Sequence, residues 1–539
     1  MNKLAWFYYR IRKMPLAEIA FRIKEIYYKN LDRTTLMTKK KISAGEIDFE
    51  HIFCLQRCDG KALGERCPEE ADRILAEADE LLANRLNIFG IETVSKDSWD
   101  WHKDPKTQEK WPENKYWSDI NIRDGSSVGG AKFVWELNRF YFFPVLGLAY
   151  FMTKEDKYAS KMFELLSDWM DKNRYLYGIN WTSCIELAVR TLNVIWGISY
   201  LKDYSLNELQ KKQIDGFIRQ HAGHIYRYPS KYSSCNNHAL AESLALFFSG
   251  HVFKQVKEAE YWFNSGKSGF EKQVGKQVFP DGGSAEITTT YLSFVADLIL
   301  LFKVFCDRSG LSYAPVIDER LKSAAGFICG IMDKNRNMPN IGDQDDAIAV
   351  DFGQDNKSNF TALLNSISLM YNLHYVFEQD IKTCILSDTE KKYGLDKKPA
   401  TEKQCLKHYA DSGLITVRDY SLGKEVFWCW NVSDMGLPPL YAHGHLDALS
   451  FYLTVDGQEV FVDTGTYLYH SGGKWRRYFR SNAAHNTVRI NEEDSSSQRG
   501  DFIYGRPYKA ELVKIEEGEN IFLEMKVSSG GHDVTRSFQ

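Results

Sequence analysis

Residues 441–465, YAHGHLDALSFYLTVDGQEVFVDTG, combine a histidine-rich cluster with two strand patterns joined by a turn. His443, His445 and Asp447 alternate, so an extended backbone would point all three toward one face. That face continues into the apolar residues Leu449, Phe451, Leu453 and Val455. Burying polar groups without partners costs about 1–3 kcal/mol each. We therefore expect a metal, a substrate or mutual hydrogen bonds here, or simply an aspartate that orients two structural histidines.

A second histidine-bearing stretch, residues 480–490 (RSNAAHNTVRI), predicts another strand. It carries His485, while Asp463 ends the second strand pattern of the opening stretch. His445, Asp463 and His485 are ligand types that hold zinc and leave a coordination position open. The sequence therefore offers a candidate metal site built from three separated positions.

The register of the two strands sets a condition on that metal site. A two-residue turn at 456–457 would place position 450 opposite Asp463 and turn Asp463 away from the histidines. One extra residue, such as a bulge at Gly457, would return Asp463 to their face. A break in the strand before Ala448 would serve equally well. The metal hypothesis requires one of these two irregularities.

Composition limits the class of protein. The chain has 539 residues, enough for two or three domains with full-size cores. Hydrophobic residues at 44% and charged residues at 26% are typical of a soluble globular protein. A net charge of −4 argues against a general nucleic-acid binder, so we expect no nucleic-acid partner. The ten cysteines show no framework spacing, which suits a reducing compartment.

The N-terminal stretch, residues 1–30, is basic and aromatic. It has no uninterrupted apolar core of the kind that signal peptides carry, and we find no run of 18 apolar residues to predict a transmembrane helix. Its apolar residues recur at helical spacing, with Lys and Arg in excess. This pattern favours either an amphipathic helix in peripheral contact with an anionic membrane or a first helix docked on the protein body.

The periodicity of the chain changes near residue 395. From about 130 to 385, helical patterns with short breaks predict antiparallel helices in a toroid or a solenoid. After a Lys-rich linker, period-2 patterns predict an antiparallel sandwich. We expect an N-terminal helical segment over 1–85, a helical toroid domain over 86–394 and a sandwich domain over 395–539. Because the chain stops inside a strand pattern, we expect the sandwich to be truncated there.

Three motifs in the helical half carry polar groups suited to chemistry. Asn237 and His238 stand where a helix begins, so they could hold a carboxylate, although an asparagine there is also an ordinary helix cap. Tyr291 follows the loop FPDGGSAE and is expected in the first turns of the next helix. The acidic loop 338–346, MPNIGDQDD, lacks full calcium-loop spacing and is interpreted as a solvated turn.

Together these motifs resemble one known family. The combination of NNHALAESLA, FPDGGSAEITTTY, PNIGDQDD, HGHLDALSF, FVDTGTY and AAHNTV looks like the heparinase II/III-type polysaccharide lyases and related alginate lyases. The resemblance runs from about residue 100 to the end, in chain order. It implies an α+β multidomain fold, an incomplete (α/α) toroid followed by an antiparallel β-sandwich.

The resemblance implies cleavage of a uronate-containing polysaccharide by β-elimination. Asn237 and His238 would neutralise the uronate carboxylate, which stabilises the anion that develops at C5. Tyr291 would protonate the departing O4, and either Tyr291 or His443 would remove the C5 proton, depending on substrate stereochemistry.

The same resemblance implies binding roles for further residues. His445, Asp463 and His485 match the family's metal positions, so we expect a structural divalent metal, most simply zinc. The expected substrate-binding residues are Trp135, Asn138, Arg139, Glu186, Tyr478 and Arg480.

The expected function is a lyase acting on an acidic polysaccharide, in synthesis or turnover of a capsule or O-antigen. The N-terminus resembles that of members found beside surface-polysaccharide genes, so we expect a bacterial protein in the cytoplasm or at the cytoplasmic membrane face. Two alternatives stay open: a non-catalytic glycan-binding or assembly protein, and a metal-assisted glycan hydrolase. The oligomeric state is left open.

Overall fold

The computed structural model describes residues 14–34, 46–122, 129–232, 235–345, 348–353, 356–375, 377–387, 404–469, 472–529 and 531–539. The chain forms two compact units, and each is described by itself. The first unit consists of Met1–Phe53, Ala78–Tyr150 and Glu155–Gly269. The second consists of Cys54–Glu77, Phe151–Lys154 and Phe270–Gln539. The predicted domain limits near residues 85 and 394 stay predictions.

Helices make up most of the first unit. They are α2 (Leu16–Arg33), α3 (Glu50–Phe53), α7 (Ala131–Leu137), α8 (Phe142–Thr153), α9 (Asp156–Lys172), α10 (Cys184–Ser199), α11 (Glu208–Arg227), α12 (Asn237–Val252) and α13 (Lys257–Gln277), with the last turns of α8 and α13 continuing into the second unit. The described part of this unit also contains two short antiparallel pairs, β1 (Glu46–Ile47) with β4 (Phe253–Lys254) and β2 (Arg85–Ile88) with β3 (Ile91–Val94).

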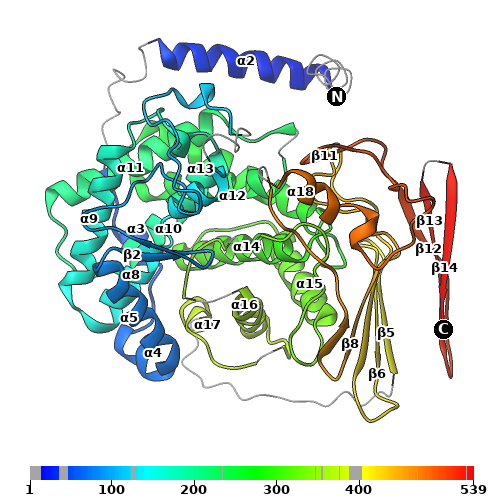
Figure 1. Ribbon diagram of the computed structural model, residues 1–539. Helices are drawn as coiled ribbons and strands as arrows, with labels where there is room; N and C mark the ends of the chain where they lie inside the picture. Colours follow the sequence, from blue (N-terminus) through cyan, green and yellow to red (C-terminus); the bar gives the residue numbers. More distant parts are fainter. Residues whose placement is uncertain are drawn as a thin grey trace. The chain divides into compact units, whose positions relative to one another are not determined.

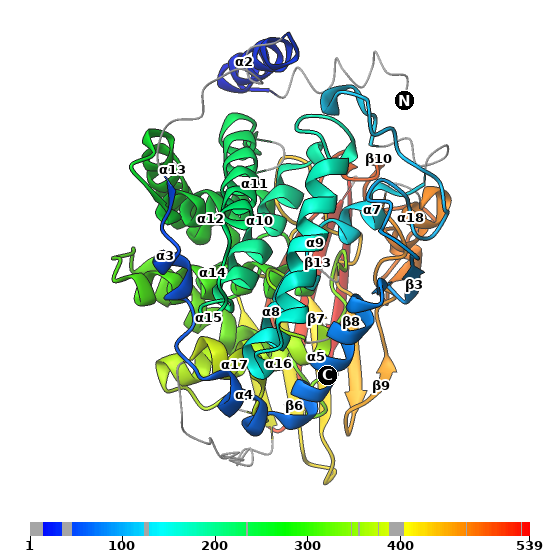
Figure 2. The same cartoon turned by 90° about the vertical axis from the view of Figure 1, so that its left-hand side faces the viewer.

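Helix α10 lies at the core of the first unit. All of its residues from Ile185 to Ser199 are buried, because the helix packs against both α11 and α12 (Figure 2). Helix α11 also packs against α9 and begins with a capping box between Asn207 and Gln210, which satisfies two backbone N–H groups. The helices predicted over this region are confirmed, except that the apolar run 132–152 forms two helices, α7 and α8.

The helices of the second unit are α4 (Gly60–Arg66), α5 (Pro68–Leu82, whose last turn belongs to the first unit), α14 (Thr289–Ser309), α15 (Val316–Ile331), α16 (Asn356–Tyr371), α17 (Ile381–Leu386) and α18 (Gly473–Phe479). Helices α14, α15 and α16 pack against one another, and α17 packs against α16.

Helix α14 is long and apolar enough to cross a membrane by length and composition, although Asp297 and Lys303 interrupt its apolar residues. Within the second unit, however, 94% of its most apolar window is buried. A core helix has the same composition, and the burial makes that the simpler interpretation.

Two antiparallel sheets form a sandwich in the second unit (Figure 1). The larger sheet contains, in chain order, β5 (Gln404–Tyr409), β6 (Leu414–Asp419), β7 (Val426–Asn431), β8 (Phe451–Val455) and β9 (Gln458–Phe461). The smaller sheet contains β12 (Lys509–Glu517), β13 (Ile521–Ser529) and β14 (His532–Phe538). A hairpin of β10 (Gln498–Gly500) and β11 (Ile503–Tyr504) precedes the smaller sheet.

The inner faces of the two sheets share one hydrophobic core. Its buried residues are Ile415, Val417, Trp430, Val432, Leu449, Ile521, Leu523 and Met525. The first five come from β6, β7 and the loops that follow β7 and precede β8, and the last three alternate along β13. The alternation of apolar and polar residues therefore predicted the sandwich correctly.

Candidate active site

The acidic loop 338–346 contains the most deeply buried carboxylate of the site, Asp343, which is 0% exposed. The interpretation of this loop as a solvated turn is therefore wrong for Asp343. Gly342 explains the burial: it has φ +66°, and a Cβ there would lie 2.5 Å from Ile287 O and 2.9 Å from His443 O. Without a side chain at 342, the loop can pass between these two segments.

Asp343 binds two of the predicted histidines. Its Oδ2 lies 3.0 Å from His443 Nδ1, and its Oδ1 lies 3.0 Å from His445 Nε2. Its own N–H donates to His443 O at 2.8 Å. An aspartate does orient the two histidines, as one interpretation expected, but the residue is Asp343 rather than Asp447. The hydroxyl of Tyr508 instead donates to Asp447 at 3.4 Å.

Arg476 completes the environment of Asp343. Both terminal nitrogens of its guanidinium donate to the carboxylate, Nη2 at 2.6 Å, and Thr466 Oγ1 donates to Oδ1 at 3.1 Å. Burial alone would raise the pKa of Asp343, but Arg476 and the histidine hydrogen bonds hold that pKa well below its ordinary value. The carboxylate is thus a fixed negative charge inside the unit.

Tyr291 lies beside this cluster, in the first turn of α14 as the sequence predicted. Its ring centroid is 4.4 Å from that of His443. Its hydroxyl is 2.9 Å from the Tyr469 hydroxyl and donates to Asp345 Oδ2 at 3.3 Å. Burial, the Tyr469 hydroxyl and the nearby carboxylates raise the pKa of Tyr291 well above its ordinary value. The phenol therefore stays protonated near neutral pH and can donate a proton.

The two ring nitrogens of His443 have different surroundings: Nδ1 is paired with a carboxylate, and Nε2 is not. Because Nδ1 is paired with the Asp343 carboxylate, Nδ1 carries the proton and Nε2 is left as the basic nitrogen. The Nε2 atom lies 3.7 Å from Glu286 Oε2, beyond ordinary hydrogen-bond distance. This arrangement matches a general base oriented by a buried carboxylate.

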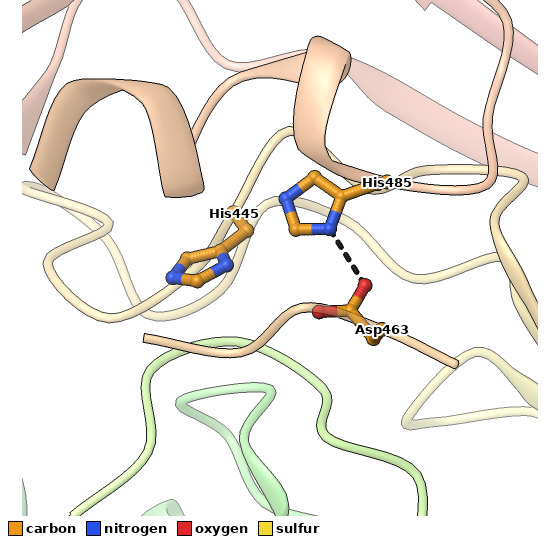
Figure 3. Close-up of side chains that lie close together, drawn as sticks. All are labelled: His445, Asp463 and His485. Atoms are coloured by element: carbon orange, nitrogen blue, oxygen red, sulfur yellow. Dashed lines mark hydrogen bonds and ion pairs between the residues drawn. The ribbon is translucent and has the colours of Figure 1, made fainter. Parts of the chain in front are cut away.

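The three predicted metal ligands also come together. His445, Asp463 and His485 offer ligand atoms that all lie within 4.8 Å of one another (Figure 3). Asp463 Oδ2 lies 2.6 Å from His485 Nδ1, as the dashed line in Figure 3 marks. His445 Nδ1 and His485 Nε2 are buried and have no hydrogen-bond partner among the described residues. Such orphaned nitrogens, beside a carboxylate, fit a divalent metal.

The pKa values of His445 and His485 are shifted in opposite directions. Burial lowers the pKa of His445 below its ordinary value, although Asp343 partly opposes that effect. For His485 burial acts in the same direction, but the Asp463 carboxylate outweighs it and raises the pKa. A metal binds neutral imidazole, so burial favours metal binding at His445, whereas the effect of Asp463 on the pKa of His485 opposes it.

Both irregularities that could bring Asp463 to the histidines are present. Leu453 pairs with Phe461 and Thr454 with Glu459, so Val460 is an extra residue in β9. The bulge thus lies at Val460 rather than at Gly457. In addition, β8 begins only at Phe451, and residues 442–447 are irregular, with bends at His443 and Leu446, instead of the expected strand. Gly444 allows that path, since a Cβ there would lie 1.8 Å from Met435 O.

The strand predicted over 480–490 is wrong. Residues Asn482–Ala484 form a 3-10 helix, and His485 follows it as the C-cap. The side chain of Asn486 donates to Phe451 O and to Val462 O, at 3.0 and 2.9 Å. This amide therefore joins the His485 segment to β8 and to the residue that follows β9.

Asn237 and His238 belong to the first unit. Asn236 is the N-cap of α12, with its side chain accepting from His238 N at 3.3 Å, and Asn237 is the first helical residue. Asn237 is 1% exposed and His238 is half-buried. Their approach to the residues of the second unit stays a prediction.

Four expected substrate-binding residues also lie in the first unit, where their polar groups serve the fold. Arg139 forms a buried two-point ion pair with Glu186, at 2.7 and 3.1 Å. Asn138 is 0% exposed, and its side chain bonds to Trp101 O, Val134 O and Trp169 Nε1. Trp135 is buried and donates to Ile179 O at 3.3 Å. Direct contact of these side chains with a substrate stays a prediction.

Two further residues expected to bind substrate, Tyr478 and Arg480, lie in the second unit and differ in exposure. Tyr478 is 44% exposed on α18. Arg480 is 0% exposed and donates to Asp501 O at 2.6 Å and to Ala442 O at 3.3 Å. As described, Arg480 binds backbone carbonyls, and its contact with substrate stays a prediction.

The sequence reasoning missed Asp343, Arg476 and Tyr469 as members of the cluster. The guanidinium of Arg476 lies 4.9 Å above the Tyr469 ring, which fixes that ring beside Tyr291. Asp343 lies among the polar residues Asn340, Gln344 and Asp345, so its local sequence did not distinguish it from a solvated turn. No pattern within 466–480 distinguished Arg476 from its neighbours Arg477 and Arg480.

Two stretches of the chain match known protein families. Residues 83–363 match the family described as heparinase II/III N-terminus, and residues 401–533 match the one described as heparinase II/III-like, C-terminal. A heparin-sulfate lyase of Bacteroides stercoris is 22% identical over 409 residues, covering 71% of this chain and 57% of the relative. One of Bacteroides thetaiotaomicron is 24% identical, covering 71% and 55%. The chain thus spans a little over half the length of these relatives.

Solved structures show the same fold. A crystal structure of heparinase III has a TM-score of 0.62 at 17% identity, covering 86% of this chain and 68% of the other. A heparan sulfate lyase mutant from Pedobacter heparinus has a TM-score of 0.50 at 19% identity, covering 95% and 71%. The expected fold, an incomplete (α/α) toroid followed by an antiparallel β-sandwich, is confirmed.

Proposed function

Because the chain belongs to the heparinase II/III family, we propose that it is a polysaccharide lyase that cleaves a uronate-containing acidic polysaccharide by β-elimination. The observation that carries this proposal is the pairing of Tyr291 with His443, whose rings are 4.4 Å apart. One is a phenol that stays protonated, and the other is an imidazole oriented by a buried carboxylate. A β-elimination needs these two groups, an acid and a base.

In the proposed reaction, His443 Nε2 takes the C5 proton of the uronate. The C5–H electrons form the C4=C5 double bond, the C4–O4 bond breaks, and the Tyr291 hydroxyl gives its proton to O4. Asp343 holds His443 in the orientation that exposes Nε2 and stabilises the imidazolium that forms. Tyr469 holds the Tyr291 hydroxyl at 2.9 Å.

The uronate carboxylate must lose its charge for the C5 proton to become acidic enough. We assign this role to Asn237 and His238 at the start of α12, by the family resemblance of their NNH motif. A side-chain amide and an imidazole at a helix N-terminus suit a carboxylate chemically.

His445, Asp463 and His485 would hold a divalent metal, with zinc as our proposal. A metal there would supply a strong local positive charge that locks the His445 and His485 loops together. Asp343 joins the two sites, because its carboxylate binds both His443 and His445. The metal's proposed role is therefore to position His443.

The test follows the C4=C5 double bond, which absorbs in the near ultraviolet and which hydrolysis does not create. The wild-type chain is mixed with a panel of uronate polysaccharides that begins with heparan sulfate, the substrate class in the names of the relatives. We expect an absorbance rise that Tyr291→Phe lowers at least about 100-fold, because a general acid contributes that much.

Tyr409→Phe is the matched control, since Tyr409 is buried to the same degree as Tyr291 and its hydroxyl has no hydrogen-bond partner among the described residues. It should retain wild-type activity. Cleavage without absorbance would instead indicate a hydrolase, and binding without cleavage a glycan-binding protein. Full activity in Tyr291→Phe would contradict the role of the tyrosine.

The biological setting is a finer proposal. We place the reaction in synthesis or turnover of a bacterial surface polysaccharide, such as a capsule or O-antigen, in the cytoplasm or at the cytoplasmic membrane face. Its support is the basic N-terminal stretch, which resembles that of family members found beside surface-polysaccharide genes. Including purified capsule and O-antigen in the same absorbance panel tests it directly.

A further inference from the structure

Helix α2 exposes a continuous apolar stripe within the first unit. Leu16, Ile23, Ile26 and Tyr27 are 84%, 63%, 59% and 62% exposed. The spacing of 7, 3 and 1 residues puts all four on one side of an α-helix. Scattered exposed apolar residues are ordinary on protein surfaces, but an aligned set on one helix indicates a binding face.

The opposite side of α2 is docked on its own unit. Asp32 is 5% exposed, and Arg227 of α11 donates to it at 2.6 Å. The Arg227 guanidinium lies 4.2 Å above the Tyr28 ring, and Tyr116 donates to Lys29 O at 3.1 Å. The interpretation of α2 as a docked helix is thus correct for one face, and that docking holds the apolar stripe outward.

Charge is distributed unevenly around α2. Residues 1–34 hold eight Lys and Arg against three acidic residues, whereas the whole chain has a net charge of −4. Of the three acids, Glu18 and Asp32 are buried and Glu25 is half-buried. The charged residues on the exposed side are Lys24 and Arg33, both basic, of which Arg33 also pairs with Asp119. The exposed face of α2 is therefore apolar with a positive border.

We propose that the exposed face of α2 binds the surface of an anionic lipid bilayer, with the helix axis parallel to the membrane plane. Basic residues are attracted to anionic headgroups, and an apolar stripe enters the boundary beneath them. An acidic polysaccharide would bind the basic side chains but would leave the apolar side chains of Leu16, Ile23 and Tyr27 exposed to water. A second copy would bring two positive borders together, which is unfavourable.

This proposal is independent of the lyase site, because α2 contributes none of the residues assigned to catalysis. A bilayer contact would keep the enzyme at the surface where a growing polysaccharide is assembled. It predicts membrane binding by the intact protein whether or not a substrate is present.

The experiment is sedimentation of the full chain with vesicles of phosphatidylcholine alone or with about one-third phosphatidylglycerol. We expect binding to the anionic vesicles that weakens as salt is raised, because ions screen the basic border. The double variant Ile23→Ser, Tyr27→Ser should bind about tenfold more weakly, since it removes apolar area from the stripe.

Leu209→Ser is the matched control, because Leu209 is 67% exposed in the same unit but lies on α11. It should bind like the wild type. Absence of wild-type sedimentation with anionic vesicles would overturn the proposal, as would equal binding by the double variant. Light scattering without vesicles tests whether a second copy of the chain covers the stripe instead. If the wild type is a dimer and the double variant is a monomer, the stripe is a dimer interface and the membrane proposal is overturned.

Discussion

At the scale of single residues, Asp343 is the group on which both sites depend. One carboxylate accepts from His443, His445, Thr466 and Arg476, and it is completely buried. A buried carboxylate is costly unless every oxygen is paired, and here the guanidinium provides the compensating charge. The main effect of the Asp343–Arg476 pair is thus to orient the imidazoles of His443 and His445, rather than to stabilise the fold.

Asp343→Asn should therefore destabilise the protein and lower activity together. Removing one partner of a buried ion pair leaves Arg476 as an uncompensated charge, at a cost of about 3–5 kcal/mol. His443 would also lose the carboxylate that fixes its tautomer. Urea denaturation and the ultraviolet assay measure the two effects. Asp434→Asn, which removes an exposed ion pair with Lys509, should cost less than about 1 kcal/mol.

The pH dependence of this pair has a definite sign. The folded pKa of Asp343 is depressed below the unfolded value of about 3.9, so its stabilisation is complete above about pH 5. It is lost as the pH falls through the depressed folded pKa. Between neutral and acid pH, the free energy of unfolding of the wild type should thus fall by more than that of Asp343→Asn, because the variant has no carboxyl to protonate at this position. Parallel acid profiles would contradict this assignment.

At the scale of elements, the β8–β9 hairpin decides whether a metal site exists. The extra residue Val460 shifts the register, and the chain leaves the ladder after Phe461. Alternation along a strand fixes which side chains share a face, so one added residue reverses every position after it. Asp463 lies two residues beyond this bulged strand, and its Oδ2 is 2.6 Å from His485 Nδ1.

Deleting Val460 should remove the metal site. The shortened β9 would regain a flat register and turn Asp463 to the other face, so zinc retained after dialysis should fall at least about tenfold. Val460→Ala is the matched control, because Val460 is 53% exposed and the substitution keeps the bulge. Mass spectrometry of metal content measures both. Equal zinc in the deletion variant would show that the bulge is irrelevant to binding.

At the scale of the whole molecule, the second unit gathers residues from distant segments. Asp343 and His443 are 100 positions apart in sequence, and Tyr291 and Tyr469 are 178 apart. Helix α14, the 338–346 loop and the loops of the larger sheet must all be folded before the acid and the base meet. Metal binding to the folded unit should therefore stabilise it as a whole.

Chelation should lower the thermal midpoint of the protein, and added zinc should restore it. A ligand present at about 100 times its Kd stabilises by about 2.7 kcal/mol, which corresponds to a shift of about 2–4 °C for a unit or chain of this size. The orphaned nitrogens of His445 and His485 are the reason to expect it. His485→Ala should lose the zinc response, while His408→Ala, an exposed histidine on β5, should keep it. A zinc response in His485→Ala would place the metal elsewhere.

Local patterns in the sequence determined the elements and the candidate chemistry. Apolar spacing of 3.6 and 2 residues predicted the helices and the sandwich strands, because periodicity reports directly which faces are buried. The motif set identified Tyr291, His443 and the three metal ligands by residue type. The order of motifs along the chain also indicated the family and its fold.

Only the tertiary structure decided which of these residues meet and what holds them. Asp343 appeared to belong to a solvated turn, and its burial depends on Gly342 passing between segments that are distant in sequence. The bulge at Val460 exists only in the pairing of β9 with β8, and the 3-10 helix before His485 is tied to a distant loop by the Asn482 side chain, which donates to Leu446 O at 2.8 Å. Neither burial nor register is a local property, because both are set by the partner segment against which a residue packs.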